Sequence, residues 1–217
     1  MKIFDMVQTS PEWWEIRKGI PTASEFDKIL TPAHGKRSAS QLPYIASLIE
    51  DYLMPLPSYF SKYGVVRGAP AMVNGQATEP EARRWYSMET GLAVQQVGFC
   101  LHDSGLFGCS PDGLVGDAGG LELKCPERRT QALYLLAGKL PHEYKCQVHG
   151  ALVVSGRPWW DFLSYHPDFP QQLLVRVERD AFTDKLEDEL DHFIERYLDA
   201  AKKLGVTLTK NEGEIVG

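Results

Sequence analysis

Two short stretches decide the fold: SPDGL at residues 110–114, followed by GLELKCP at residues 120–126. Their Pro-Asp-Gly and Gly-Gly turn residues flank apolar positions, which predicts antiparallel strands joined as a hairpin. Side chains alternate along a strand, so Glu122 and Lys124 project from the same face. If the preceding segment brings Asp112 alongside, two carboxylates and one ammonium meet at one end of the sheet.

Such a group of charges favours a metal site. Two carboxylates this close repel each other unless a divalent cation lies between them, and an oxygen-only set is typical of Mg²⁺ or Mn²⁺ rather than Zn²⁺. A third acid, Glu79, belongs to a helix that TEPE at residues 78–81 predicts to begin at Thr78, with Pro80 in its first turn. The alternative is a surface hairpin in which Glu122 and Lys124 merely contact each other.

The whole chain is expected to form one domain, over residues 1–217. Its 43% hydrophobic and 24% charged residues exclude disordered and fibrous classes. The formal net charge of −6 argues against non-specific coating of nucleic acid, but not against a nuclease whose carboxylates bind cations. The four cysteines lack CxxC spacing, and neither a signal peptide nor an apolar run long enough to span a membrane is seen, so a cytoplasmic location without membrane contact is expected.

The order of elements predicts an α/β fold, a central mixed β-sheet flanked by helices. Helices are expected around residues 13–17, from Ser24 where TASE has capping-box spacing, and at 44–54, 78–90, 129–137, 144–154 and 182–204. Strands are expected at 93–101, 106–110, 120–125, 159–165 and 173–178, the first three as an antiparallel meander. Residues 56–75 are expected to be a connection with a short helical turn.

The sequence resembles the PD-(D/E)xK nucleases, and specifically the phage lambda exonuclease and YqaJ-type viral recombinase family. SPDGL and GLELKCP carry the core of the resemblance. A W-x(3)-R-x-G-x(2)-TASE pattern, the Glu79 helix and the Gln147-Val148 helix occur in the family's order, so the similarity extends over about residues 12–155. The resemblance implies a PD-(D/E)xK restriction-endonuclease-like core.

The resemblance also implies a metal site. Asp112, Glu122 and the backbone carbonyl of Leu123 would be metal ligands, and Glu79 would support a second site. Two Mg²⁺ ions per active site are expected, with Mn²⁺ as a substitute. These ions would activate a water and offset charge on the leaving oxygen.

Two further residues have implied roles in catalysis. Lys124 would orient the attacking water, and its ammonium should stay protonated beside the carboxylates. Gln147 matches a family glutamine near the nucleophile, where an amide holds a water without changing the local charge. The alternative for Gln147 is a polar residue on a helix face at the margin of the core.

Arg17, Thr22 and Ser24 form a second constellation. A guanidinium beside a hydroxyl at a helix start makes an anion site that suits a terminal phosphate. The family uses these positions for the 5′-phosphate of a DNA end. The alternative is that Thr22 or Ser24 caps a helix while Arg17 forms an ion pair with Glu15 or Glu25.

Contacts with the rest of the DNA are expected from three residues. Lys36 and Arg37 lie in a polar loop where the family also has basic residues, which favours contact with backbone phosphates. Met72 falls where the family places an apolar side chain that wedges apart the terminal base pair. A methionine in the core is the alternative.

The function implied is a Mg²⁺-dependent 5′-to-3′ exonuclease of a phage recombination system. It would act on the ends of linear double-stranded DNA, release 5′-mononucleotides and leave 3′ overhangs for annealing. The family forms ring-shaped homotrimers, and a single-strand annealing protein is the implied partner. Two alternatives remain: a PD-(D/E)xK endonuclease of restriction or repair type, and an inactive module that binds DNA ends.

Overall fold

The computed structural model describes residues 1–63 and 70–208, with side chains described over 1–63 and 78–208. The helices are α1 (Pro11–Arg17), α2 (Gln41–Leu53), α3 (Leu56–Tyr63), α4 (Pro70–Thr90), α5 (Arg128–Ala137), α6 (Lys145–Ser155) and α7 (Ala181–Lys203), with 3-10 helices η1 (Ala23–Lys28) and η2 (His142–Tyr144). The strands are β1 (Lys2–Phe4), β2 (Val94–Gln95), β3 (Phe99–Leu101), β4 (Gly108–Cys109), β5 (Gly113–Val115), β6 (Gly119–Lys124), β7 (Trp159–Ser164) and β8 (Leu173–Glu178). Within the described residues, no helix has both the length and the apolar character needed to cross a membrane.

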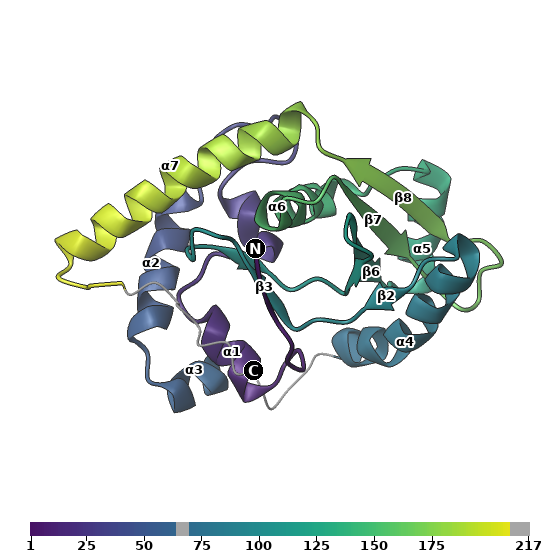
Figure 1. Cartoon of the computed structure of the whole chain (residues 1–217), viewed down its shortest axis with the longest axis horizontal. Coiled ribbons are helices and arrows are strands. Elements are labelled where there is room, and N and C mark those ends of the chain that lie inside the picture. Colours follow the sequence, from purple (N-terminus) through teal and green to yellow (C-terminus); the bar gives the residue numbers. More distant parts are fainter. Residues whose placement is uncertain (64–69, 209–217) are drawn as a thin grey trace.

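The main sheet has five strands in the order β2-β5-β6-β7-β8 (Figure 1). Neighbouring strands are antiparallel except β6 and β7, which are parallel and are connected through α5, η2 and α6. A parallel pair needs such a crossover, which explains why helices follow directly after the GLELK strand. The predicted α/β class, with a central mixed sheet flanked by helices, is confirmed.

Alternating side chains give the sheet two apolar faces. Trp160 and Phe162 of β7 belong to the core that also contains buried residues of α2, α6 and α7. Leu121 and Leu123 of β6, together with Leu163, pack against α4. The sheet therefore lies between α6 and α4, and residue 122 faces α6 because its neighbours face α4.

Two adjacent glycines allow the close approach of β6 and β7. Gly119 and Gly120 pair with Trp159 and Trp160. A Cβ atom at Gly119 would lie 2.0 Å from the Trp159 ring, and one at Gly120 would lie 2.2 Å from the Trp160 ring. Any side chain at either position would displace an indole, so these glycines are needed for the register that places Glu122 and Lys124.

The predicted meander is only partly correct. Residues 93–101 form two strands rather than one: β2 joins the main sheet, and β3 joins a second sheet with the order β1-β3-β4. Residues 113–115, which lie outside the expected strands, form β5 and pair with β6 as the hairpin. Gly98 explains the break, because a Cβ atom there would lie 2.4 Å from the Met6 carbonyl oxygen.

Most predicted helices are confirmed within a few residues, but the start of α4 and the type of the helix in the TASE segment are wrong. Helix α4 begins at Pro70 rather than Thr78, so Pro80 lies inside it and Glu79 is not in its first turn. The Thr-x-x-Glu pattern also fits a helix interior, and Pro80 removes only one backbone hydrogen bond. The TASE segment forms the 3-10 helix η1, and Thr22 makes no side-chain cap. The connection expected over residues 56–75 contains α3 and the start of α4, while residues 64–69 lie outside the described part.

Candidate active site

Asp112 lies directly before β5 begins, beside β6. The ladder between these strands ends at Gly113 and Leu121, and the Asp112 side chain continues it, because its Oδ2 accepts a hydrogen bond from the Leu123 N–H at 2.6 Å. In a strand, the N–H and C=O of one residue point to the same edge. The Leu123 carbonyl therefore lies on the edge occupied by Asp112, as its predicted role requires.

Glu122, Lys124 and Gln147 meet on the α6 face of the sheet. Glu122 is buried, and its Oε1 accepts hydrogen bonds from Lys124 Nζ at 2.5 Å and from Gln147 Nε2 at 2.6 Å. Strand alternation places Lys124 beside Glu122, and the crossover through α6 places Gln147 beside the same carboxylate. The structure thus brings together the predicted carboxylate, ammonium and amide, and Gln147 is in contact with the site.

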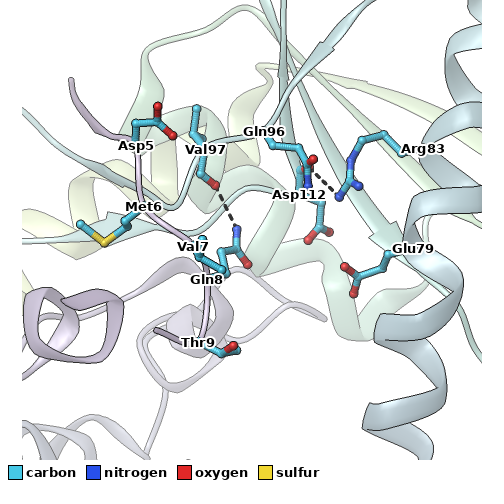
Figure 2. Close-up of a pocket in the computed structure, with 10 residues that line it drawn as sticks. All are labelled: Asp5, Met6, Val7, Gln8, Thr9, Glu79, Arg83, Gln96, Val97 and Asp112. Atoms are coloured by element: carbon cyan, nitrogen blue, oxygen red, sulfur yellow. Dashed lines mark hydrogen bonds between the residues drawn. The ribbon is translucent and has the colours of Figure 1, made fainter. Parts of the chain in front are cut away.

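Glu79 and Asp112 point into one cavity of about 550 Å³ (Figure 2). Burial and the nearby Asp112 carboxylate raise the pKa of Glu79 to about 7. Burial also raises the pKa of Asp112. For Glu122, burial acts together with the Asp112 charge and again raises the pKa. Three acids that resist ionisation in one place form a region that a cation would stabilise.

Lys124 remains a cation in this environment. Burial opposes its charged form, but the carboxylates of Glu122 and Asp112 outweigh burial and raise the pKa of the ammonium. The side chain is 27% exposed, so it is not sealed in the core. Its chemistry is therefore electrostatic and hydrogen-bonding, rather than that of a general base.

Two residues that the sequence did not point to also line the cavity. Gln8 Nε2 donates to the Pro111 carbonyl at 2.8 Å and to the Val97 carbonyl at 3.2 Å. Arg83 Nη2 donates to the Asp112 carbonyl at 3.3 Å. Gln8 carries no local signal, whereas Arg83 follows Glu79 by one helical turn and so shares its helix face. Both fix the backbone that carries Asp112.

The donor chemistry fits Mg²⁺ or Mn²⁺. Asp112, Glu122, Glu79 and the Leu123 carbonyl offer oxygen only, the set that hard divalent cations prefer. Among the described residues, no three His, Cys, Asp or Glu side chains already surround one point at metal-binding distance. Glu122 accepts from Lys124 through Oε1 and Asp112 accepts from Leu123 through Oδ2, which leaves the second oxygen of each carboxylate for an ion.

A second polar cluster surrounds Arg17 at the end of α1. Arg17 Nη1 donates to Ser110 Oγ at 2.8 Å, and Nη2 donates to Thr22 Oγ1 at 3.3 Å. Thr22 Oγ1 and Ser24 Oγ lie 3.2 Å apart, so the predicted trio is brought together. Ser110 joins it and was not predicted, although it stands within the SPDGL motif. Thr22 does not cap η1 because its hydroxyl lies against Arg17.

The alternative role for Arg17, an ion pair with Glu15 or Glu25, is not seen. Glu25 pairs with Lys28, and no carboxylate within the described residues forms an ion pair with Arg17. The guanidinium lies 4.1 Å from the centre of the Trp13 ring. Burial lowers its pKa, but a guanidinium stays charged at neutral pH. A desolvated cation among hydroxyl groups has the donor chemistry that an anion would need.

Lys36 and Arg37, predicted to contact DNA, are not brought to these clusters. Arg37 Nε pairs with Glu189 Oε1 on α7 at 2.9 Å, and Lys36 is exposed in the same loop. Neither residue lines the cavity. Met72 lies in the first turns of α4, and its side chain is outside the described residues.

Comparisons with known proteins identify a family for this chain. The sequence matches the YqaJ-like viral recombinase domain over residues 12–158. The fold is similar to an alkaline exonuclease, LHK-Exo, from Laribacter hongkongensis, with 34% identity, a TM-score of 0.76, and coverage of 90% of this chain and 96% of that one. The complex of LHK-Exo with dAMP gives 32% identity, a TM-score of 0.69, and coverage of 90% and 98%.

A phage-related exonuclease from Haemophilus somnus 129PT shares the fold, with 14% identity, a TM-score of 0.58, and coverage of 85% of this chain and 96% of that one. Comparison with curated protein sequences gives no match. The family match covers both the Arg17 cluster and the GLELK strand. The chain belongs to the YqaJ-like viral recombinase family and is a nuclease of the phage exonuclease type.

Proposed function

We propose that this chain is a Mg²⁺-dependent exonuclease that degrades the 5′-terminated strand from the ends of linear double-stranded DNA. It would release 5′-mononucleotides and leave 3′ single-stranded overhangs. One observation carries the proposal: the anion cluster at Ser110 and the carboxylate cluster at Asp112 are joined by a single residue, Pro111. An enzyme that holds a terminal phosphate next to its cleavage site works from ends.

The anion cluster would bind and orient the 5′-phosphate. Arg17 Nη1 and Nη2 donate to Ser110 and Thr22, each retains a second N–H for the phosphate, and Ser24 adds a hydroxyl. Charge-assisted hydrogen bonds of this kind are stronger than those to neutral oxygens. A phosphomonoester carries more charge than an internal phosphodiester, so the cluster favours a strand end.

The carboxylate cluster would perform hydrolysis. Asp112, Glu122, the Leu123 carbonyl and Glu79 would hold two divalent cations, which supply Lewis acidity and offset charge on the leaving oxygen. Lys124 would hold and orient the attacking water with its ammonium. Gln147, whose amide contacts Glu122 at 2.6 Å, would fix the carboxylate and leave the local charge unchanged.

The proposed product agrees with a relative's ligand. LHK-Exo, at 32% identity, has been obtained in complex with dAMP, a mononucleotide. We extend the proposal to a ring-shaped homotrimer that encloses DNA, and to a single-strand annealing protein as partner, as the family resemblance implies. Action on the DNA of a bacterial host would place the enzyme in the cytoplasm.

The test is nucleotide release from linear duplex DNA labelled at either strand end, with a 5′-phosphate or a 5′-hydroxyl. Reactions in Mg²⁺ and in chelator would be run beside a covalently closed circle. We expect Mg²⁺-dependent release from 5′ ends, faster on phosphorylated ends, with the circle intact. Cutting of the circle would indicate an endonuclease instead, and end binding without cleavage in Mg²⁺ or Mn²⁺ would indicate a binding module.

A further inference from the structure

The ammonium of Lys124 has an aromatic neighbour that the function proposed above does not use. Lys124 Nζ lies 5.1 Å from the centre of the Tyr144 ring, within the range of a cation–π interaction. Its hydrogen-bond partner among the described residues is Glu122 alone, at 2.5 Å. Two groups therefore set the position of this ammonium, one carboxylate and one ring.

The Tyr144 ring is itself held firmly. It stacks on Phe162 with ring centres 5.2 Å apart and an angle of 29° between the planes. Phe162 is fully buried and pairs with Glu122 across the parallel strands. Tyr144 also ends η2, where its N–H donates to the Pro141 carbonyl at 3.1 Å. The ring is thus fixed by the strand pair that carries Lys124.

The two partners of Lys124 differ in what else they must do. Glu122 Oε1 also accepts from Gln147, and the proposed function requires the same carboxylate to bind a cation. A carboxylate that turns toward a cation holds the ammonium less well. The face of an aromatic ring attracts an ammonium without carrying a formal charge or competing for the cation.

We propose that Tyr144 is a positioning residue for Lys124, and that its ring keeps the ammonium directed at the cleavage site while Glu122 binds the metal. This inference rests on the proposed function. The ring, and not the hydroxyl, supplies the interaction. Phenylalanine at position 144 should therefore keep the positioning role, and an aliphatic residue of similar size should lose it.

The first test is kinetic, on the full chain with Mg²⁺ and phosphorylated linear duplex. We expect Tyr144→Phe to keep kcat within about threefold, and Tyr144→Leu to lower kcat about tenfold with little change in KM. Tyr134→Leu is the matched control, because that ring meets Tyr144 edge-on at 6.4 Å and forms no cation–π contact with Lys124. In a Lys124→Ala background, Tyr144→Leu should have no further effect on kcat.

The second test does not need activity. The ε-methylene protons of Lys124, assigned by comparison with Lys124→Arg, should show an upfield ring-current shift in the NMR spectrum of the unaltered chain and of Tyr144→Phe. That shift should be lost in Tyr144→Leu.

The outcomes separate the two proposals. An absent shift, equal kinetic losses in Tyr144→Phe and Tyr144→Leu, or an additive loss in the double variant would overturn the role of the ring while the nuclease proposal stands. If the unaltered chain releases no nucleotides, the proposed function fails, and the positioning role fails with it even if the shift is present.

Discussion

The two polar clusters of this protein differ in charge and in the way their charged groups are held. Around Asp112, three acids with raised pKa values crowd one end of the sheet, and Glu122 is bonded to Lys124. Around Arg17, the guanidinium already donates to two hydroxyl groups and lies on the Trp13 ring. The carboxylates of the first cluster are crowded together, whereas the guanidinium of the second is already held by two hydroxyl groups.

This difference suggests a division of labour. On the proposed function, the Arg17 cluster would select the strand end at little reorganisation cost, so it is suited to recognition. On the proposed function, a crowded group of carboxylates whose charge a cation would offset is suited to metal-assisted catalysis. The following predictions test whether the two tasks can be separated.

The largest effect is expected from Asp112→Asn. Loss of a ligand carboxylate should lower turnover about a thousandfold or more, since metal catalysis supplies several kcal/mol. Binding of 5′-phosphorylated duplex, measured by fluorescence anisotropy in Ca²⁺, should keep its preference over 5′-hydroxyl duplex. If that preference disappears together with the activity, the clusters are not separable.

Lys124→Ala should lower kcat about a hundredfold, in the range typical for loss of a group that acts on the attacking water. Mn²⁺ binding, measured by calorimetry, should persist, because the ligand oxygens remain. Unchanged turnover would remove Lys124 from the reaction. Loss of metal binding would give it a structural role instead.

Arg17→Ala should lower kcat/KM on phosphorylated ends about tenfold to a hundredfold, the usual value of a hydrogen bond to a charged group. Hydroxyl ends should be affected much less. The exposed Arg84→Ala on α4 is a control for loss of one positive charge. Equal losses on both kinds of end would contradict the assignment of Arg17 to the 5′-phosphate.

The smallest effect is on stability. Glu79→Gln should raise the free energy of unfolding in chelator by about 1 kcal/mol at pH 8, a value reduced for solvent screening. The folded-state pKa of Glu79, about 7, lies above its ordinary value of 4.5, so its carboxylate destabilises the fold above pH 7. The gain should shrink as the pH falls from 7 to 4.5. Urea unfolding at several pH values measures it, and a loss of stability in Glu79→Gln would contradict the crowding of charges described here.

The sequence predicted the carboxylate cluster well because its geometry is mostly local. Strand alternation places Glu122 beside Lys124, and one hairpin places Asp112 against Leu123. A central mixed sheet was predicted correctly, but β5 was not predicted and residues 93–101 were assigned to a single strand. The start of α4 was missed because a capping pattern and a proline can also occur inside a helix.

The remaining contacts depend on segments far apart in the chain. Ser110 meets Arg17 only because α1 packs beside the segment leading to Asp112, and the separation of 93 residues hides this contact from any local pattern. Gln8 is separated from Pro111 by 103 residues and has no motif of its own. Tyr144 stands three positions before Gln147, yet only the packing of η2 on β7 brings its ring to Lys124.

The single residue between Ser110 and Asp112 limits the distance between the two clusters. The Cα atoms of Ser110 and Asp112 cannot be more than about 7 Å apart. This limits the distance between the anion cluster and the carboxylate cluster. Gln8 holds the residue between them in place by donating a hydrogen bond to the Pro111 carbonyl. On the proposed function, the length of DNA removed in each step is then set by this backbone distance rather than by recognition of a base. That length is one nucleotide.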